Sequence, residues 1–272
     1  MLINGKQTDQ ISALDRGIQY GDGLFETIAV IDGHCCLWER HIQRLCHGCE
    51  RLGIAVPDPA ELFTEAEAAI KGHQKGVLKI IVTRGAGGRG YRPPVNMPAS
   101  RIVYYSPWPD YPEDYWKTGV SMRICSTCLG INPALAQLKH LNRLEQVLAR
   151  SEWDDSSIFE GIMLDSDGRV IEGTMSNLFL IKNNILITPD LSRCGIAGVM
   201  RELIIELAAT LNIPVTIKDV DLDELKTADA MFISNSLIGI LPVKELANQR
   251  YSLDPIFPAL IKAVDKHAGG CS

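Results

Sequence analysis

Residues 138–146 read Leu-Lys-His-Leu-Asn-Arg-Leu-Glu-Gln. The leucine spacing predicts a helix from about Leu141 to Trp153, with Lys139 at its entrance. A lysine that is partly buried there loses solvation of its charged form, so its pKa should fall below the ordinary value of about 10.4. A neutral amine is a nucleophile that can form a Schiff base. A solvated surface lysine is the alternative, and this stretch taken alone favours it.

A second polar group lies farther along the chain, at Glu172, between the end of an apolar strand and a loop of small polar residues. A buried carboxylate needs a partner, and a ring nitrogen that is held protonated would serve. Gly198-Val-Met-Arg201 then opens a helix, where backbone N–H groups can bind an anion. Ser236 follows the predicted strand Met231–Ile233 and offers a hydroxyl group to the same anion.

His41 and Arg44 are three residues apart on a helix predicted from Trp38 to Leu52, so they share a face. Spacing alone favours a solvated polar face, since exposed charges are the norm. The functional interpretation is that Arg44 points into a cleft and binds a phosphate group.

A glycine-rich segment, Gly85-Ala-Gly-Gly-Arg-Gly90, matches the pattern Gly-x-Gly-x-x-Gly after a predicted strand. A dinucleotide site needs a helix to begin there, and the following Tyr91-Arg-Pro-Pro94 cannot open one. A mobile glycine loop is favoured instead. Its Arg89, Tyr91 and Arg92 would close on an anionic substrate, because arginine binds carboxylates bidentately.

Two cysteine pairs, Cys46-x-x-Cys49 and Cys125-x-x-Cys128, resemble the halves of a four-thiolate zinc site. The first pair falls within an amphipathic helix, where thiols act as small buried hydrophobic groups. Structural zinc usually binds at tight knuckles. We therefore expect no metal site, and free thiols at all 8 cysteines, since no secretory signal is visible.

The composition is that of a globular protein. The chain has 272 residues, of which 46% are hydrophobic and 22% are charged, and its formal net charge is −6. These values exclude a disordered chain, and the lack of a basic block argues against nucleic acid or an anionic membrane as the partner. No apolar run reaches the roughly 18 residues of a membrane helix. We expect a cytoplasmic protein.

The order of predicted elements favours a two-domain α+β protein. Ser106–Pro112 contains three prolines, which cannot continue a helix or a central strand. We expect a smaller N-terminal α/β domain over 1–105, an interdomain linker over 106–118 and a larger C-terminal α/β domain over 119–272. The other predicted elements are strands at 23–31, 77–83, 102–105, 119–124, 161–164 and 177–181, and helices at 60–71, 199–211 and 255–266.

Together and in this order, the motifs resemble the fold-type IV pyridoxal-phosphate enzymes, the group of branched-chain and D-amino-acid aminotransferases. The resemblance runs from Asp15 to Val243. It implies a two-domain fold like that of D-amino-acid aminotransferase, pyridoxal 5'-phosphate as the cofactor, and a homodimer with its sites between the domains. It also implies the site residues: Lys139 as the catalytic Schiff-base lysine, Arg44 and Ser236 as phosphate ligands, Glu172 facing the pyridine nitrogen, and Val199 and Met200 as backbone N–H donors to the phosphate.

Within this group, the blocks Gly76–Lys79, Gly85–Tyr91 and Lys139–Gln146 are most similar to a subgroup of lyases. These release pyruvate from 4-amino-4-deoxychorismate and leave 4-aminobenzoate, a folate precursor. Phe25 supports this subgroup, because the D-amino-acid aminotransferases carry a substrate-contacting tyrosine there. Met200 departs from the more usual threonine and keeps the backbone donor.

The resemblance therefore predicts a small-molecule substrate bound by Phe25, Arg89, Tyr91 and Arg92. An aminotransferase of D-amino or branched-chain amino acids would use the same lysine, arginine and glutamate, and it is the first alternative. A non-catalytic zinc-binding or interaction protein, built on the two cysteine pairs, is the second.

Overall fold

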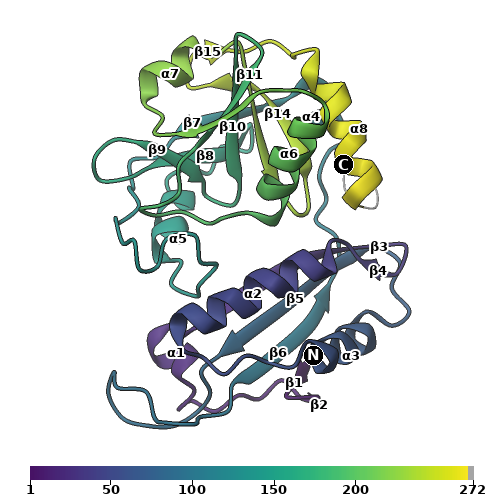
Figure 1. Cartoon of the computed structure of the whole chain (residues 1–272), viewed down its shortest axis with the longest axis vertical. Coiled ribbons are helices and arrows are strands. Elements are labelled where there is room, and N and C mark those ends of the chain that lie inside the picture. Colours follow the sequence, from purple (N-terminus) through teal and green to yellow (C-terminus); the bar gives the residue numbers. More distant parts are fainter. Residues whose placement is uncertain (269–272) are drawn as a thin grey trace. The chain divides into compact units, whose positions relative to one another are not determined.

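The computed structural model describes residues 1–268, which divide into two compact units (Figure 1). Unit 1 comprises Met1–Pro109 and Lys139–Asn142, and unit 2 comprises Asp110–Leu138 and the chain from Arg143 onward. The chain first passes from unit 1 to unit 2 between Pro109 and Asp110, which lies within the predicted linker 106–118. The division into domains of 1–105 and 119–272 remains a proposal. Lys139 belongs by its contacts to unit 1.

Unit 1 is built on a six-stranded antiparallel sheet in the order β2-β1-β6-β5-β3-β4. Helices α2 (Trp38–Leu52) and α3 (Pro59–Ile70) pack on it. Asp58 caps α3, because its side chain accepts a hydrogen bond from the Ala60 N–H. The strands are β1 (Leu2–Ile3), β2 (Lys6–Gln7), β3 (Gly23–Ile31), β4 (His34–Cys35), β5 (Gly76–Thr83) and β6 (Ser100–Ser106), and a short helix α1 (Arg16–Tyr20) precedes β3.

The two faces of this sheet differ because side chains alternate along a strand. Leu24, Glu26 and Ile28 of β3 are buried on the face that carries the helices. A Cβ atom at Gly48 of α2 would lie 2.8 Å from Leu24 Cδ1, so the glycine lets the helix approach the sheet closely. Phe25 points to the opposite face and is half-buried.

Unit 2 is built on a nine-stranded mixed sheet in the order β12-β11-β10-β13-β14-β7-β8-β9, with β15 paired to β14. The sheet is curled. Asn177 in β10 donates from Nδ2 to Glu172 Oε2 in β9, although β9 stands at the far end of this order (3.4 Å). The strands are β7 (Val120–Ile124), β8 (Ile158–Leu164), β9 (Val170–Gly173), β10 (Asn177–Lys182), β11 (Ile185–Pro189), β12 (Val215–Lys218), β13 (Ala230–Asn235), β14 (Gly239–Leu246) and β15 (Gln249–Arg250).

The helices of unit 2 join its sheet through buried apolar groups. They are α4 (Asp114–Thr118), α5 (Leu144–Arg150), α6 (Val199–Thr210), α7 (Leu222–Thr227) and α8 (Ile256–Ala268). Phe179 of β10 stacks on Phe232 of β13 with ring centres 4.8 Å apart, and Phe257 of α8 meets Phe232 edge-on at 5.7 Å. These three rings tie the sheet to its C-terminal helix.

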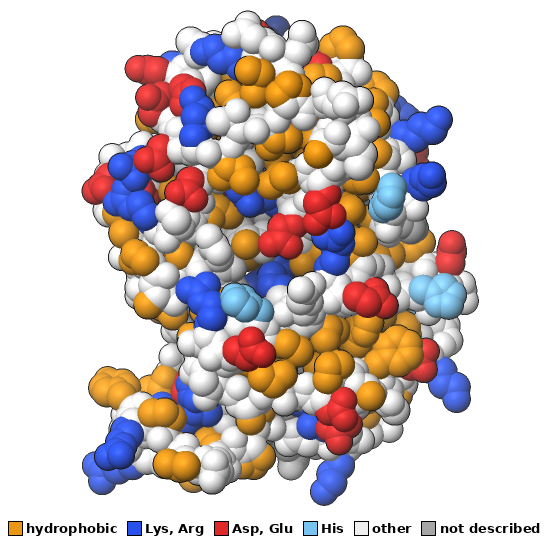
Figure 2. Space-filling model, viewed as in Figure 1, with side chains coloured by type: hydrophobic (Ala, Val, Ile, Leu, Met, Phe, Trp, Pro, Cys, Tyr) orange, Lys and Arg blue, Asp and Glu red, His pale blue; other side chains and the backbone are white. Residues whose placement is uncertain are grey.

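Several predicted elements are confirmed, and one is wrong. The strand 23–31 and the helix Trp38–Leu52 have the predicted bounds. The helix predicted from Leu141 to Trp153 is only α5, Leu144–Arg150, because residues 139–143 form no helix and His140 makes an isolated antiparallel bridge with Leu24 of β3. None of the helices within residues 1–268 is long and apolar enough to cross a membrane. On the face shown in Figure 2, acidic and basic side chains are interspersed.

The stacking of Phe232 on Phe179 in unit 2 predicts how strongly a truncation at Phe232 destabilises the protein. Replacing Phe232 by alanine should lower the free energy of unfolding by about 3–5 kcal/mol, because it opens a cavity between Phe179 and Phe257. Chemical denaturation, followed by tryptophan fluorescence, measures the change. Phe63→Ala, at a partly exposed ring of α3, is the control and should cost about 1 kcal/mol or less. Equal effects of the two variants would contradict the assignment of Phe232 to the core.

Candidate active site

Lys139 is held beside the first residues of β3. Its carbonyl oxygen accepts a hydrogen bond from the Phe25 N–H (2.9 Å), and the Leu141 N–H donates to Gly23 O (3.0 Å). The Lys139 ammonium nitrogen lies 4.4 Å from the centre of the Phe25 ring, a favourable cation–π distance. The prediction that Lys139 stands at a helix entrance is wrong, because the lysine extends the edge of a sheet.

A second lysine contacts the same ring and was missed from the sequence. Lys79 of β5 places its ammonium nitrogen 4.0 Å from the centre of the Phe25 ring and donates to Thr27 Oγ1 (3.1 Å). Burial lowers the pKa of Lys79, and the negative charge of Glu26 acts against this shift. The sequence does mark this residue, since Lys79 is the only charged residue in the otherwise apolar strand β5. Lys79, Lys139 and Phe25 therefore form one group of side chains in unit 1.

Arg44 and His41 share a face of α2, as their spacing predicts, and both bind Glu26. Arg44 Nε donates to Glu26 Oε1 (2.8 Å), and His41 Nδ1 lies 2.7 Å from Glu26 Oε2. The favoured interpretation of a solvated face is wrong, because His41 has no exposed surface and Glu26 is only 1% exposed. Sequence reasoning missed Glu26. A charged residue at one of the alternating buried positions of a strand indicates a buried partner, and Glu26 lies at such a position between Leu24 and Ile28.

The electrostatics of this cluster favour a charged Glu26. Burial alone would raise the pKa of Glu26, but the charge of Arg44 and the hydrogen bond from His41 lower it to about 2. Burial lowers the pKa of His41, with Glu26 acting against the shift. The carboxylate thus fixes the Arg44 guanidinium against the sheet, and its Nε and Nη2 atoms both donate to Glu26.

The glycine-rich segment is a loop in the structure. Residues 84–99 form no helix, so the arrangement required for a dinucleotide site is absent from this stretch. Arg89, Tyr91 and Arg92 are all exposed on it. The Tyr91 ring contacts the Tyr20 ring of α1, with centres 5.5 Å apart.

Unit 2 contributes a buried carboxylate at Glu172. It lies in β9, where the Ile196 N–H donates to its Oε2 at 2.8 Å and Asn177 Nδ2 approaches the same atom at 3.4 Å. Asn177 also donates to the Ile196 carbonyl (2.9 Å). The Glu172 side chain is therefore oriented by two donors, one from the backbone and one from a side chain.

The beginning of α6 presents backbone N–H groups. Gly198 is its N-cap and no side chain caps the helix, while Val199 and Met200 form its first turn. A Cβ atom at Gly198 would lie 2.0 Å from Asn177 Oδ1, so a glycine is required there. Ser236 follows β13 directly and is half-buried. Unit 2 thus provides a carboxylate at Glu172, the backbone N–H groups of the first turn of α6, which no side chain caps, and the Ser236 hydroxyl group.

Glu160 of β8 is a further buried carboxylate that the sequence did not indicate. Burial raises its pKa, and hydrogen bonds act against that shift. Its oxygens hold the turn between β9 and β10, directly after Glu172. The donors are the backbone N–H groups of Gly161, Thr174 and Met175 and the hydroxyl groups of Thr174 and Ser176.

The cysteine pairs do not assemble a metal site in the described part of the chain. Within residues 1–268, no group of three or more His, Cys, Asp or Glu side chains is arranged to bind an ion. The seven cysteines of this range are free, and Cys271 lies outside the described residues. Burial raises the pKa of Cys49 and of Cys125 to about 12.

Comparison with known proteins finds similarity to enzymes over nearly the whole chain. The family model of the class IV amino-transferases matches residues 23–246. An aminodeoxychorismate lyase of Vibrio harveyi is 36% identical over 93% of each chain. A crystal structure of 4-amino-4-deoxychorismate lyase from Pseudomonas aeruginosa is 47% identical, with a TM-score of 0.94 over 97% of this chain and 98% of that one. A D-alanine aminotransferase of Bacillus licheniformis is 28% identical over 92% of this chain and 89% of its own length.

The Glu26 cluster predicts a pH-dependent stability. The depressed pKa of Glu26 stabilises the fold above pH 4.5, and this contribution is lost as the pH falls from 4.5 to about 2. Glu26→Gln should therefore lower the free energy of unfolding by about 3–5 kcal/mol at pH 7, because it removes the buried negative charge that both Arg44 and His41 contact. The difference from the wild type should shrink as the pH falls toward 2.

Denaturant titrations at several pH values measure this difference. Glu61→Gln is the control, because this exposed carboxylate pairs with Arg101 at the surface of the same unit and should contribute about 1 kcal/mol or less. A Glu26→Gln deficit that stays constant from pH 7 to pH 2.5 would contradict the depressed pKa.

Proposed function

Because the chain belongs to the class IV aminotransferase family, we propose that it is a pyridoxal-phosphate-dependent lyase that converts 4-amino-4-deoxychorismate into 4-aminobenzoate and pyruvate. One observation carries the choice within the family. Similarity over nearly the whole chain is higher to the two lyases, at 36% and 47% identity, than to the D-alanine aminotransferase, at 28%. The product 4-aminobenzoate is a precursor of folate.

The residues of the two units fit pyridoxal phosphate. Lys139 supplies the amine that would bond to the cofactor aldehyde, and Arg44 a cation for its phosphate group. In unit 2, Glu172 suits a protonated pyridine nitrogen, since it is a buried carboxylate fixed by the Ile196 N–H. The uncapped first turn of α6, at Val199 and Met200, suits a phosphate, as does the Ser236 hydroxyl.

The chemistry divides between the cofactor and the chain. Bound pyridoxal phosphate supplies an electron sink for the charge that remains when a proton leaves the substrate carbon bearing nitrogen. The Lys139 amine takes that proton, since it is the nucleophile and base of the group in unit 1. The carbon–oxygen bond to the enolpyruvyl group then breaks and the ring becomes aromatic. Lys139 returns the proton to the departing group, which leaves as pyruvate.

The dicarboxylate substrate calls for cations. Arg89 and Arg92 of the exposed loop supply two, and guanidinium groups bind carboxylates in a bidentate manner. Lys79 adds a third on the sheet face of Phe25, next to Lys139. Phe25 supplies an apolar, aromatic surface at the position where the D-amino-acid aminotransferases carry a tyrosine.

We place the enzyme in the cytoplasm as a homodimer. The seven free cysteines of residues 1–268 are consistent with a reducing compartment. Leu144, Val147 and Leu148 of α5 are each more than half exposed, which is typical of a surface that another chain covers.

The decisive test is a turnover assay on 4-amino-4-deoxychorismate, which follows 4-aminobenzoate fluorescence and pyruvate together. We expect equal amounts of both products from the wild type. Lys139→Ala should lower kcat at least about a thousandfold and abolish the visible absorbance of bound cofactor, because the bond-forming amine is gone. Lys117→Ala removes an exposed surface lysine and should change neither readout.

Two outcomes would contradict the proposal. A Lys139→Ala variant with both absorbance and turnover would refute the role of the lysine. A wild-type protein with bound cofactor and no lyase products would favour the alternative, a D-amino-acid or branched-chain aminotransferase. The family and the relative from Bacillus licheniformis support that alternative. Conversion of D-alanine or leucine in the presence of a keto acid would then identify it.

The apolar surface of α5 predicts the oligomeric state. Sedimentation equilibrium should give twice the mass of one chain, and Val147→Glu with Leu148→Glu should shift the equilibrium toward the monomer at the same protein concentration. Lys226→Glu, at an exposed position of α7, is the matched surface control. A wild-type monomer at micromolar concentration would contradict the dimer.

A further inference from the structure

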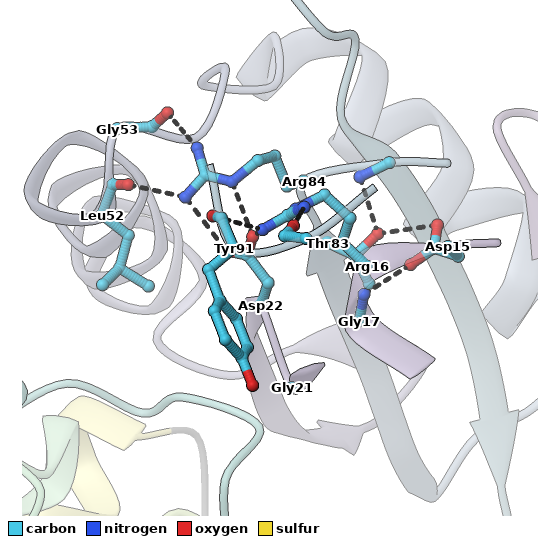
Figure 3. A network of polar contacts seen from close by, with 12 residues as sticks. Asp15, Arg16, Gly17, Gly21, Asp22, Leu52, Gly53, Thr83, Arg84 and Tyr91 are labelled. Atoms are coloured by element: carbon cyan, nitrogen blue, oxygen red, sulfur yellow. Dashed lines mark hydrogen bonds and ion pairs between the residues drawn. The ribbon is translucent and has the colours of Figure 1, made fainter. Parts of the chain in front are cut away.

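The segment Asp15-Arg16-Gly17 lies directly against the glycine loop, which we define as residues 84–99 between β5 and β6 (Figure 3). The Arg16 N–H donates to Gly85 O (2.9 Å), and the Gly87 N–H donates to Leu14 O (3.2 Å). The chain before β3 thus runs alongside the start of the loop.

Asp15 closes the base of the glycine loop. Its Oδ2 accepts hydrogen bonds from the hydroxyl groups of Thr83 and Ser100, both at 2.9 Å. Thr83 is the last residue of β5 and Ser100 the first of β6, so one carboxylate oxygen joins the two ends of the loop. The other oxygen accepts from the Gly17 N–H (2.8 Å). A Cβ atom at Gly17 would lie 2.3 Å from Thr83 Cγ2, so only a glycine permits this approach.

Arg16 holds the middle of the loop. Its guanidinium group donates from Nη1 to Gly90 O (2.8 Å) and from Nη2 to Tyr91 O (3.0 Å). The side chain is only 3% exposed, and it also lies over the Tyr20 ring at 4.8 Å. The planar fork of an arginine can reach two consecutive carbonyl groups at once, which a lysine cannot do. These two carbonyls belong to the residues between Arg89 and Arg92.

Asp22 balances the charge of Arg16 and connects it to α2. Arg16 Nε donates to Asp22 Oδ2 (2.8 Å), and Arg84 donates to both oxygens of the same carboxylate (2.7 and 3.0 Å). Arg84 also donates to Leu52 O (2.8 Å) and to the Gly53 carbonyl, at the end of α2. Arg84 therefore shares the counter-ion of Arg16, and its guanidinium group donates to Asp22, Leu52 and Gly53 (Figure 3).

The backbone of the glycine loop has a specific shape. Gly85 has a φ of +100° and a Cβ atom there would lie 2.3 Å from Pro98 O, on the returning arm of the loop. Gly90 has a φ of +81°, where residues with a side chain are strained. Such a conformation costs backbone entropy, so contacts such as those of Asp15 and Arg16 are needed to hold it.

We propose that Asp15 and Arg16 are positioning residues, which clamp the glycine loop at its base and its middle so that Arg89, Tyr91 and Arg92 meet an anionic substrate in one fixed arrangement. The role of these three residues in substrate binding rests on the proposed function. The clamp itself does not, because it consists of contacts within unit 1. Its consequence is that an exposed loop rich in glycine behaves as an ordered element.

Limited trypsin digestion of the native holoenzyme tests the clamp without an activity assay. The bond Arg89–Gly90 is a trypsin site, whereas Arg92 precedes a proline and is resistant. Arg16→Gln should be cut after Arg89 about tenfold faster than the wild type, because proteolysis tracks the population of the open loop and two charge-assisted hydrogen bonds are lost. The product is a fragment that begins at Gly90, identified by mass spectrometry.

Two variants give this experiment its controls. Arg84→Gln removes a guanidinium group from the same Asp22 and leaves the bonds to Gly90 and Tyr91, so its cleavage after Arg89 should stay near the wild-type rate. Arg16→Lys keeps the charge but loses the fork, so its rate should lie between those of Arg16→Gln and the wild type. Cleavage of Arg16→Gln no faster than Arg84→Gln would overturn the clamp.

Kinetics on the lyase substrate provide the second readout. Arg16→Gln should raise KM about tenfold or more and leave kcat within a few-fold, with cofactor absorbance unchanged, because the loop arginines are displaced and the lysine is not. A fall in kcat at constant KM would overturn the positioning role. If the wild type lacks lyase activity, the proposed function fails, and the trypsin result still decides the clamp.

Discussion

Two backbone hydrogen bonds determine where Lys139 lies. They join Phe25 to Lys139 and Leu141 to Gly23, so that a segment from the middle of the chain continues the sheet of unit 1. The residues on either side of this segment belong to unit 2. The constraint also explains why Phe25, Lys79 and Lys139 share one location, since the register of β3 against β5 sets Lys79 opposite Thr27, two residues from Phe25. The register of β3 against β5 and the pairing of Lys139 with β3 therefore bring these three side chains together.

Elements with a regular hydrophobic periodicity could be predicted from the sequence. Elements whose residues favour more than one type of secondary structure could not. The strand at 23–31 and the helix at 38–52 were found with correct bounds, because hydrophobic spacing and the flanking Asp-Gly turn agree. Strand β14 was missed. It contains Pro242 at a buried position opposite Phe232, and a proline argues against a central strand. The leucine spacing favoured a helix that begins at Leu141, but residues 139–143 are not helical, since Lys139 and Leu141 form long-range backbone hydrogen bonds with β3.

The candidate site was predicted in part for the same reason. The sequence singled out Lys139, Arg44 and Glu172 as candidates, because each is a polar residue of distinctive chemistry within a recognisable motif, and their roles stay predictions. Their partners were not found. Glu26, Lys79 and Glu160 are isolated charges inside apolar strands, and only the alternation of buried and exposed positions marks them. The spacing of His41 and Arg44 showed a shared face, but which way that face points depends on a carboxylate 15 and 18 residues away.

Three acidic residues near the start of β3 show how one group type serves different purposes. Asp15 accepts only from neutral donors, two hydroxyl groups and one N–H, and so fixes backbone geometry. Asp22 is shared by two guanidinium groups, so it links a loop and a helix end through charge. Glu26 binds both the Arg44 guanidinium group and the buried His41 ring, on the face of the sheet that α2 covers. A carboxylate can do all three because it accepts several bonds and carries charge. An amide has one acceptor oxygen and an NH2 donor, so it cannot accept at both positions as Asp15 does. It also carries no charge to pair with the arginines at Asp22 and Glu26.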